Sequence, residues 1–481
     1  MHVARPALAL WLLACTDGAG SGTDAGADGG FDWPGCERID TQPGLLAGRA
    51  AEFDRLARDL HLAPDGLLRN VYLAEDLETV AHYRHTENTI LWSGIYLASQ
   101  ALRYAVTGSA EAEQNARRVL DGLGDLTRLT GVRGLYGRCL ADPVVCYDHD
   151  GHGRPGWTDS PVPGYEGWAY RNDVSKDGYD GLIFGYALAA EHFDDARILA
   201  DVRERLREIA DHIVGNRLQI VDADGQVTEH GALYQSALDD YPGFNAMLAA
   251  SFVKVAQTAL GDPELDDFYY ACMMRTRSGI DCPPVDPVDL GPYIESMEQR
   301  LFLFQADCKQ NYDNFDMCYQ AIYPLLRRER DEALRARLLF VLRENMFHSP
   351  DERYQSLAPI GNAWYTFAYA ALSRDDPRAD PVLADAVDRA VCTLKDFPAL
   401  KFDRPIPAGA QQEVCRSRLD EPVAAEPVPL SEYHFDNYLW RLDFFEIQAG
   451  RAGDRRLVYS PEDYLLAYWL GRYHGILDAG Q

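Results

Sequence analysis

The sequence predicts an all-α fold, a closed ring of helical hairpins with a few short strands in its loops. Six times, an aromatic residue set among Asp, Asn or His introduces an apolar helical run, at residues 88–92, 173–180, 239–245, 311–315, 362–365 and 434–440. Each run is followed by a segment of opposite character, such as the charged amphipathic stretches 110–126, 196–213 and 327–345. Since no single hairpin can bury its own apolar face, this alternation favours a closed ring, with the helix starts at one end.

In the first half of the chain, residues 51–60 and 73–84 are expected to be helical. Residues 89–106 predict a buried helix that ends at Gly108, because helix C-termini favour a left-handed glycine, and 110–129 predict its outer partner. Residues 131–176 are rich in Gly, Pro, Asp and aromatics and predict a long loop, the kind of segment that often carries function. Residues 178–192 and 195–214 predict the second helical pair.

In the second half, residues 218–228 predict a β-hairpin with its turn at Asp222-Ala223-Asp224-Gly225, because an Asp-Gly pair between apolar runs favours a tight turn. Four helical pairs are expected after it: 243–259 with 264–274, 315–326 with 330–345, 364–372 with 381–394, and 437–445 with 461–476. The chain therefore predicts six or seven hairpins.

The first residues resemble the export signal of a bacterial lipoprotein. Arg5 supplies a positive charge, residues 7–13 a short apolar core, and Leu12-Leu13-Ala14-Cys15 a lipobox with Cys15 as the acylated residue. Residues 1–15 are then the signal, 16–32 a flexible Gly/Ala/Asp linker, and 33–481 a single domain. The alternative is an ordinary signal peptide or a buried first helix. We expect a lipid-anchored envelope protein, periplasmic or surface-facing, or a secreted one without the lipobox.

Charge and hydropathy exclude several partners. The formal net charge of -29 is spread along the chain without a basic patch, so nucleic acid is not expected as a partner. No run of 18 or more apolar residues follows the first segment, so we expect the protein to contact a membrane only through its lipid anchor.

The cysteines indicate an oxidising compartment. Eight of them form sequence-local couples in loop-like stretches, although spacing does not prove connectivity. The couples are Cys139 with Cys146, Cys272 with Cys282, Cys308 with Cys318, and Cys392 with Cys415. No couple has the Cys-x-x-Cys spacing of a zinc site, so no metal is predicted from them, and Cys36 is left over.

Several segments resemble the six-hairpin glycosidase-like toroids, which have an (α/α)6 barrel. They are Trp92-Ser93-Gly94, Ser175-Lys176-Asp177-Gly178-Tyr179-Asp180-Gly181 with Phe184-Gly185, Val221 to Gly225 with Thr228 and Gly231, and Tyr459-Ser460-Pro461 with 464–473. The resemblance covers most of residues 50–478 and identifies no family within the superfamily. It implies a pocket for a carbohydrate at the end of the ring where the inner helices begin.

Sugars present apolar ring faces to aromatic side chains and hydroxyls to carboxylates, amides and cations. Helix N-termini add free amides and a positive field. The candidate substrate-binding residues are Trp92, Trp168, Arg171, Tyr179, Tyr241, Asn245, Tyr312, Asp313, Trp364, Tyr438 and Trp440.

The strongest candidate for chemistry is the segment 166–180, which holds Asp173, Asp177 and Asp180 around one loop and helix start. Asp177 and Asp180 are three residues apart, so we expect both on one side of the first helical turn. The alternative for Asp177 is a helix cap. Glycoside hydrolysis needs a second carboxyl across the scissile bond. The best candidates are Asp436 and Asp313, followed by Asp239 and Asp240, each with a cap or turn role as its alternative.

His434 is a candidate acid or base because its ordinary pKa lies near neutrality, with a hydrogen-bonded core residue as the alternative. Lyase or epimerase chemistry would use His and Tyr, with Arg138 and Arg171 binding a uronate. A calcium site is an alternative at Asp148-His149-Asp150-Gly151-His152-Gly153, but the terminal Glu of a calcium loop is missing, so an acidic turn is favoured and no cofactor is predicted.

Three functional hypotheses follow. The first is an envelope carbohydrate-active enzyme, a glycoside hydrolase acting through paired carboxylates. The second is a polysaccharide lyase or sugar epimerase that uses His, Tyr and Arg. The third is a non-catalytic glycan-binding or scaffold lipoprotein, because fold alone does not fix function.

Overall fold

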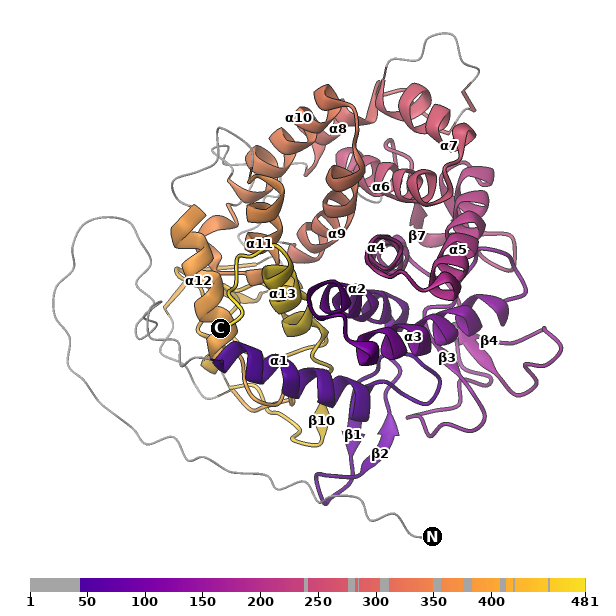
Figure 1. Ribbon diagram of the computed structural model, residues 1–481. Helices are drawn as coiled ribbons and strands as arrows, with labels where there is room; N and C mark the ends of the chain where they lie inside the picture. The colour runs from indigo at the N-terminus through magenta and orange to yellow at the C-terminus, as the bar shows by residue number, and fades with distance from the viewer. Residues whose placement is uncertain are drawn as a thin grey trace.

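The computed structural model describes residues 44–237, 241–275, 282–283, 285–302, 311–348, 356–374, 383–406, 412–417, 420–448 and 450–480. Within them, six inner helices form a closed ring (Figure 1), in which each helix contacts the next and the last contacts the first. The inner helices are α2 (Thr89–Thr107), α4 (Lys176–His192), α6 (Pro242–Leu260), α9 (Tyr312–Arg328), α11 (Ala363–Leu372) and α13 (Glu462–Tyr473). The predicted all-α toroid is confirmed.

An outer helix packs on each inner one. In ring order from α2, the outer helices are α3 (Ala110–Arg128), α5 (Ala196–Gly215), α7 (Pro263–Asp267), α10 (Glu332–Phe340), α12 (Leu383–Asp396) and α1 (Leu45–Leu56). Three of them continue into the π-helical turns η1 (Ala57–His61), η2 (Phe268–Met274) and η3 (Val341–Phe347). A further helix, α8 (Tyr293–Arg300), packs on α6.

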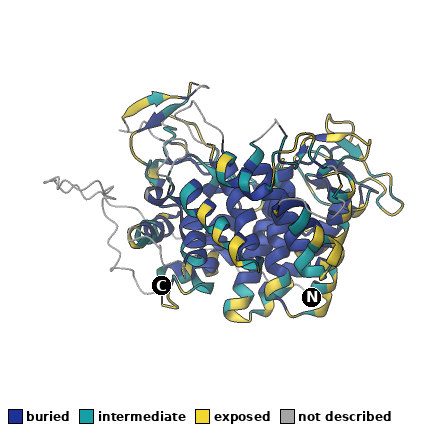
Figure 2. Cartoon of the chain, turned by 90° about the horizontal axis from the view of Figure 1, so that it is seen from above, coloured by how far each residue is buried: buried dark blue, intermediate teal, exposed yellow. Residues whose placement is uncertain are grey.

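The two layers differ in burial as the sequence alternation predicts. The inner helices are buried along most of their length, whereas the outer helices keep an exposed face (Figure 2). Ser109 and Asp195 cap two outer helices by accepting backbone hydrogen bonds from Ala112 and from Arg197 and Ile198. The core therefore lies between the two rings and within the inner one.

Glycines set the distance between α2 and α4. A Cβ atom on Gly94 would lie 2.2 Å from the carbonyl oxygen of Gly181, and one on Gly185 would lie 2.4 Å from that of Gly94. No larger residue fits unless the two backbones move apart. The close approach brings the starts of α2 and α4 together at one end of the ring.

In the described residues, ten short strands form four small sheets in the loops. The sheets have the strand orders β10-β1-β2, β3-β5-β4, β6-β7 and β8-β9. The strands are β1 (Val71–Leu73), β2 (Val80–Tyr83), β3 (Leu140–Ala141), β4 (Trp157–Asp159), β5 (Ala169–Arg171), β6 (Gln219–Val221), β7 (Val227–Ala232), β8 (Glu413–Arg416), β9 (Pro422–Ala424) and β10 (Leu457–Val458). β6 and β7 confirm the predicted hairpin at 218–228, and β3, β4 and β5 lie in the predicted long loop.

The helix expected at 73–84 is wrong. β1 pairs antiparallel with β2, with Val71 opposite Tyr83, and with β10, with Val71 opposite Val458. Val71, Leu73 and Val458 form a small separate core. The apolar residues at alternate positions of β1 therefore form the buried face of a sheet and not one side of a helix. The Asp76 carboxylate accepts the backbone N–H groups of Glu78 and Thr79 and thereby fixes the turn.

The last hairpin also differs from the expected pairing of 437–445 with 461–476. Residues 430–445 contain only the short 3-10 turns η5 (Leu430–Glu432) and η6 (Leu439–Arg441). A third 3-10 turn, η4 (Ala358–Ile360), precedes α11. The inner helix α13 takes α1 as its outer partner instead, so segments near the two ends of the chain complete the ring.

The cysteine couples meet different outcomes. Cys272 and Cys282 form a disulfide, as predicted, with an S–S distance of 2.00 Å. Cys392 and Cys415 are both disulfide-bonded. The couple of Cys139 with Cys146 is wrong, because both are free thiols. Cys139 is buried beside β3, whereas Cys146 lies exposed beside β2, where its thiol contacts the carbonyl oxygen of Ala81 at 3.4 Å.

Cys318 is a buried free thiol, and Cys308 lies outside the described residues. So do Cys15, the linker 16–32, Cys36, Asp239 and Asp240. Among the helices that the structure does describe, we find none with the length and apolar character needed to cross a membrane.

Candidate functional site

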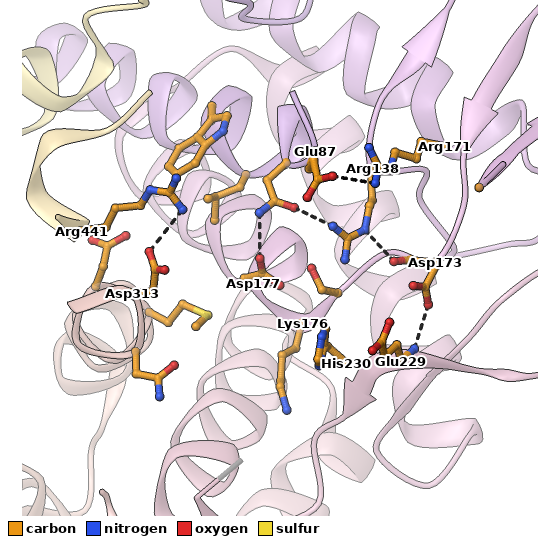
Figure 3. A pocket seen from close by; sticks show the side chains of 18 of the residues that line it. Glu87, Arg138, Arg171, Asp173, Lys176, Asp177, Glu229, His230, Asp313 and Arg441 are labelled. Atoms are coloured by element: carbon orange, nitrogen blue, oxygen red, sulfur yellow. Dashed lines mark hydrogen bonds and ion pairs between the residues drawn. The ribbon is translucent and has the colours of Figure 1, made fainter. Parts of the chain in front are cut away.

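A polar cavity of about 510 Å³ lies where α2, α4 and α9 begin (Figure 3). Its position matches the end of the ring at which the pocket is expected. It is lined by Glu87, Asn88, Leu91, Trp92, Arg138, Gly156, Arg171, Asn172, Asp173, Ser175, Lys176, Asp177, Glu229, His230, Asn311, Asp313, Asn314, Asp316, Met317 and Arg441.

The residues that precede the inner helices fall into two groups. Asn311 and Asn362 cap α9 and α11 in the usual way, because their side chains accept the backbone N–H of Asn314 and of Tyr365. Asn88 and Ser175 precede α2 and α4, but neither side chain caps its helix. Both line the cavity. Two residues of a type that favours capping are therefore directed to the site instead.

Asp177 projects into the cavity from the first turn of α4. Its Oδ2 accepts a hydrogen bond of 2.9 Å from Nδ2 of Asn88, which precedes α2. The neighbouring starts of α2 and α4 thus hold this carboxylate in place.

Asp313 enters the cavity from α9. Its side chain is 53% exposed, because it faces the open cavity. The walls of the cavity nevertheless surround its carboxyl on most sides. Nη1 of Arg441 donates to its Oδ1 at 3.2 Å. Burial raises the pKa of Asp313, the charge of Arg441 opposes this, and the charge of Asp177 raises it further. Asp313 therefore keeps its proton to higher pH than an ordinary aspartate.

Asp316 lies one turn further along α9, on the cavity floor, and is almost completely buried. Nε1 of Trp364 and Nε2 of Gln320 donate to its two oxygens at 3.1 and 2.6 Å. Burial, aided by the charge of Asp313, raises the pKa of Asp316 to about 8. It is therefore protonated at neutral pH.

Asp180 lies beneath the cavity and is not among the lining residues, so it does not share the accessible side of α4 with Asp177 as expected. The side chain is 1% exposed, and its Oδ2 has no hydrogen-bond partner among the described residues. Burial raises the pKa of Asp180 well above its ordinary value, helped by the charges of Asp316 and Asp177. The Asp180 carboxyl therefore ionises less readily than that of an ordinary aspartate.

Asp173 lines the cavity but is used to fix the loop. Its backbone is left-handed (φ 56°), which is uncommon outside glycine. Its Oδ1 accepts the N–H of Glu229 at 2.8 Å, and its own N–H donates to Asp222 at 2.7 Å. These bonds join the loop before α4 to the β6-β7 hairpin, so Asp173 supports the wall of the cavity.

Four polar atoms of cavity residues are buried without a hydrogen-bond partner in the part of the chain that the structure describes. They are Nε1 of Trp92, Oδ1 of Asn172, Oγ of Ser175 and Nε of Arg441. Buried polar atoms are nearly always paired in folded proteins, and such a cluster around one cavity indicates that a polar ligand or water completes the pairing.

A second hollow of about 340 Å³ adjoins the cavity and shares Glu87, Asn88, Trp92 and Arg441 with it. Asp436 lines this hollow, where Nη2 of Arg441 donates to its Oδ2 at 3.1 Å. Burial opposes ionisation, but Arg441 and the N–H of Asn437 together hold the pKa of Asp436 below its usual range. The predicted second carboxylates thus separate: Asp313 lies in the cavity and Asp436 in the adjoining hollow.

His434 lines neither hollow. It is buried with its Nδ1 3.3 Å from Oδ1 of Asp403, and burial lowers its pKa. His434 is therefore a core residue, which is the alternative to an acid or base role that the sequence left open.

Most of the predicted sugar-binding aromatics lie in the core instead of the cavity. Tyr179, Tyr312, Trp364, Tyr438, Trp440 and also Asn245 are at most 1% exposed. Two of them make hydrogen bonds within the core: Tyr179 donates to the carbonyl of Gly134, and Trp440 donates to that of Asp463. Trp168 packs on Tyr165 and Tyr241 on Phe302, and neither lines the cavity. Trp92, Arg171 and Asp313 are the members of the set that do.

Asp316 and Arg441 are two of the cavity residues that were not among the candidates from the sequence. Asp316 had a usable signal, because its spacing of three from Asp313 repeats that of Asp177 and Asp180. Arg441 had none beyond its place after Trp440, since it reaches Asp313 across 128 residues.

The segment considered as an alternative calcium loop contributes to a group formed by His85, Asp148 and His149. Two imidazoles do not fit calcium, which prefers oxygen ligands. Both ring nitrogens of His85 are already engaged, Nδ1 with Arg69 at 3.2 Å and Nε2 with the carbonyl of His149 at 2.9 Å. Burial and the charge of Arg69 lower the pKa of His85 to about 2. These residues do not fit a calcium site in this arrangement.

The closed helical ring with one deep polar site at the helix starts makes this an α/α-toroid protein. No protein-family model matches the chain. No curated protein matches its sequence. Many solved structures resemble it, among them the three described next. A D-mannose isomerase is 12% identical at a TM-score of 0.47, covering 93% of this chain and 100% of that one.

The α-1,6-mannanase of Salegentibacter sp. HEL1_6 is 9% identical at a TM-score of 0.42, covering 90% of this chain and 100% of that one. A sugar epimerase from a ruminal bacterium is 10% identical at 0.41, also covering 90% and 100%. Likeness at this level carries no information on activity, which depends on the residues of the cavity.

Proposed function

We propose that the chain is a carbohydrate-active enzyme of the glycoside hydrolase type, with Asp313 as the general acid and Asp177 as the base or nucleophile. The observation that carries the proposal is the pair itself. Two carboxyls enter one cavity from different helices, α4 and α9 (Figure 3), and their surroundings differ. Asp313 has a raised pKa, whereas Asp177 accepts a hydrogen bond from Asn88.

Such a pair meets the requirement of glycoside hydrolysis. The protonated carboxyl gives its proton to the glycosidic oxygen as that bond breaks, and the charged carboxylate attacks the anomeric carbon or takes a proton from the attacking water. Asp313 can hold the proton, and Asp177 can provide the negative charge. Asp316 keeps the floor beneath them neutral because its own pKa is raised to about 8.

The other lining groups suit a sugar. Trp92, Asn172, Ser175 and Arg441 offer unpartnered donors and acceptors that sugar hydroxyls can satisfy. The cavity of about 510 Å³ falls within the range of small-molecule sites, roughly 300–1,000 Å³. The adjoining hollow gives room for a further sugar unit beyond Trp92 and Arg441.

A mechanism based on His and Tyr has less support. Of the described residues that line the cavity, His230 is the single histidine and none is a tyrosine. The turnover experiment below distinguishes an enzyme from the alternative, a non-catalytic glycan-binding protein.

The test is to incubate the full chain with a panel of neutral and acidic oligosaccharides and to measure turnover as the release of new reducing ends. Asp177→Asn and Asp313→Asn should each lower kcat/KM by roughly 10²–10⁴-fold without loss of folding. Asp211→Asn, at an outer-helix carboxylate that is 53% exposed, is the matched control and should retain full activity. Unchanged turnover in both cavity variants would reject the assignment, and binding without turnover would favour a glycan-binding protein.

The envelope location is part of the proposal and rests on the N-terminal sequence alone. If Cys15 is acylated, the protein should fractionate with membranes and take up a labelled fatty acid. Cys15→Ser should release it to the soluble fraction, and unaltered fractionation would contradict the lipid anchor.

A further inference from the structure

We propose that the cavity recognises the carboxylate of an acidic sugar, through an anion site made by Arg138, the hydroxyl of Ser175 and the start of α4. The inference rests on the proposed function and names its substrate class, a glycoside that carries a uronic acid. Three independent features of the site support it.

The first feature is the charge of Arg138, which no carboxylate among the described residues takes up. Its Nε donates to the main-chain oxygen of Asp173 at 2.6 Å, and its Nη1 approaches Oδ1 of Asn88 at 3.4 Å (Figure 3). Both partners are neutral acceptors. A guanidinium has five N–H donors, so most of this group is left for a ligand.

The other cavity arginines are already neutralised. Arg171 pairs with Glu87 at 2.8 Å, and Arg441 pairs with Asp313 and Asp436. Of the two arginines named as uronate binders from the sequence, the structure therefore favours Arg138 and not Arg171.

The second feature is the unused hydroxyl of Ser175. This residue is 2% exposed and lines the cavity, yet its Oγ has no hydrogen-bond partner within the described ranges. Serine before a helix ordinarily caps it, but here the side chain makes no capping bond. A buried hydroxyl without a partner at a cavity is a donor available to an acceptor on a ligand.

The third feature is the N-terminus of α4 itself, a helix of 17 residues that begins at Lys176. The N–H groups of a first helical turn have no partner within the helix, and the helix dipole favours a negative group there. Arg138, Ser175 and Lys176, the first residue of α4, line the same cavity as Asp177.

The balance of charge selects a singly charged carboxylate over a phosphate monoester, which carries up to two negative charges. Asp173, Asp177 and Glu229 line the same cavity, so a doubly charged group would meet strong repulsion. One unpaired guanidinium matches one negative charge. A neutral sugar would leave that charge without its partner.

Binding is measured by calorimetry on the full chain, so the result does not depend on turnover. The probes are methyl β-D-glucuronide, methyl α-D-galacturonide, the methyl ester of each, and glucose 6-phosphate. At least one acid should bind, and its ester should bind roughly 10-fold or more weakly, because a charge-assisted hydrogen bond is lost. The phosphate should bind more weakly than the acid, because its second negative charge meets the carboxylates of the cavity.

Two variants locate the site. Ser175→Ala should weaken acid binding several-fold and leave the ester unchanged, with an unaltered Tm because no hydrogen bond within the protein is lost. Arg138→Gln should abolish the difference between acid and ester. Arg133→Gln, at an arginine that is 60% exposed on the outer surface, is the control and should change neither.

The outcomes separate the two proposals. Equal Kd values for acid and ester, or no binding of either acid, overturn the anion site even if the enzyme cleaves neutral glycosides. A preference for the phosphate overturns the choice of carboxylate, and an Arg138→Gln variant that still discriminates between acid and ester overturns the assignment of the residue. Acid binding that depends on Arg138, without cleavage of any glycoside, instead overturns the hydrolase and leaves the anion site standing.

Discussion

Arg441 donates a hydrogen bond to Asp313 at 3.2 Å, although 128 residues separate the two in sequence. The same guanidinium donates to Asp436 and lies over the ring of Trp92, with 5.1 Å between its Cζ and the ring centroid. One side chain therefore holds the proposed acid and links the cavity to the adjoining hollow. The position of Asp313 therefore depends on a contact between α9 and the turn η6, which lie far apart in the sequence.

Arg441→Met should move the alkaline limb of the pH–activity profile to higher pH. Burial raises the pKa of Asp313 and the charge of Arg441 lowers it, so removing the cation raises this pKa further. The acid then stays protonated to higher pH. We expect kcat to fall roughly 10-fold or more because the acid also loses its positioning bond. The measurement is kcat/KM against pH.

The control for this variant is Arg171→Met. Arg171 lines the same cavity but pairs with Glu87, so its loss should leave the alkaline limb in place. An alkaline limb that does not move in Arg441→Met would show that Asp313 is not the group that limits activity.

Much of the fold was accessible from the sequence because inner and outer helices differ in apolar pattern. The helix at 89–106, its end at Gly108 and the hairpin at Asp222 to Gly225 depend on local chemistry and were predicted. The sixth hairpin was not, because α1 and α13 lie near opposite ends of the chain and no local signal pairs them. The strands β1 and β2 were mistaken for a helix for the same reason, since β10 completes their sheet from residue 457.

The site was predicted in part. An aspartate in a first helical turn was correctly expected at the ring end, and Asp177 and Asp313 both line the cavity. Helical spacing could not tell which way each residue turns, so Tyr179 and Asp180 were placed in the cavity although they are buried. Arg441 depends on a tertiary contact, and the importance of Arg138 depends on its having only neutral partners among the described residues, which no sequence pattern records.

The free energy of unfolding should fall as pH rises from the ordinary pKa of Asp316, 3.8, to its pKa in the folded protein, about 8. A carboxyl whose folded pKa is raised favours folding below its unfolded pKa, and this contribution is lost as pH rises toward 8. Asp316→Asn cannot ionise, so the free energy of unfolding should depend less on pH, by roughly 3–4 kcal/mol between pH 5 and 8.

The measurement is urea unfolding of both proteins at the two pH values. Asn at this position can keep its bonds, because Gln320 has an unpartnered Oε1 that can accept from the new amide after a rotation of its own side chain. Asp211→Asn, on the surface, should leave the slope as it is. Parallel pH dependences in wild type and Asp316→Asn would contradict the raised pKa.

Cys146 should react in the folded protein and Cys139 should not. Both are free, but Cys146 is exposed whereas Cys139 is buried, and burial raises the pKa of the Cys139 thiol to about 12. A thiol-specific reagent should therefore label Cys146 under native conditions and Cys139 only after unfolding, because the thiolate is the reactive form. Mass spectrometry of the labelled peptides distinguishes the two. Protection of both cysteines until reduction would restore the disulfide predicted from the sequence.

Gly94→Ala should damage both stability and activity, because this glycine sets the distance between α2 and α4. Its added Cβ would lie 2.2 Å from the carbonyl oxygen of Gly181, and that atom belongs to a helix backbone that cannot turn aside. Overpacking of this kind costs roughly 1–3 kcal/mol, and here the helices must separate to relieve it. Separation lengthens the bond from Asn88 to Asp177, so kcat should fall more than the loss of folded protein explains.

Gly48→Ala is the matched control, since Gly48 lies within α1 and a Cβ added there would meet no neighbouring atom within 4 Å. Alanine is the better helix former, so this variant should be more stable by up to about 1 kcal/mol, with activity unchanged. Urea unfolding and kcat, measured on the same preparations, separate the two effects. If Gly94→Ala loses stability but keeps the kcat of its folded fraction, the spacing of α2 and α4 holds the ring together without positioning Asp177.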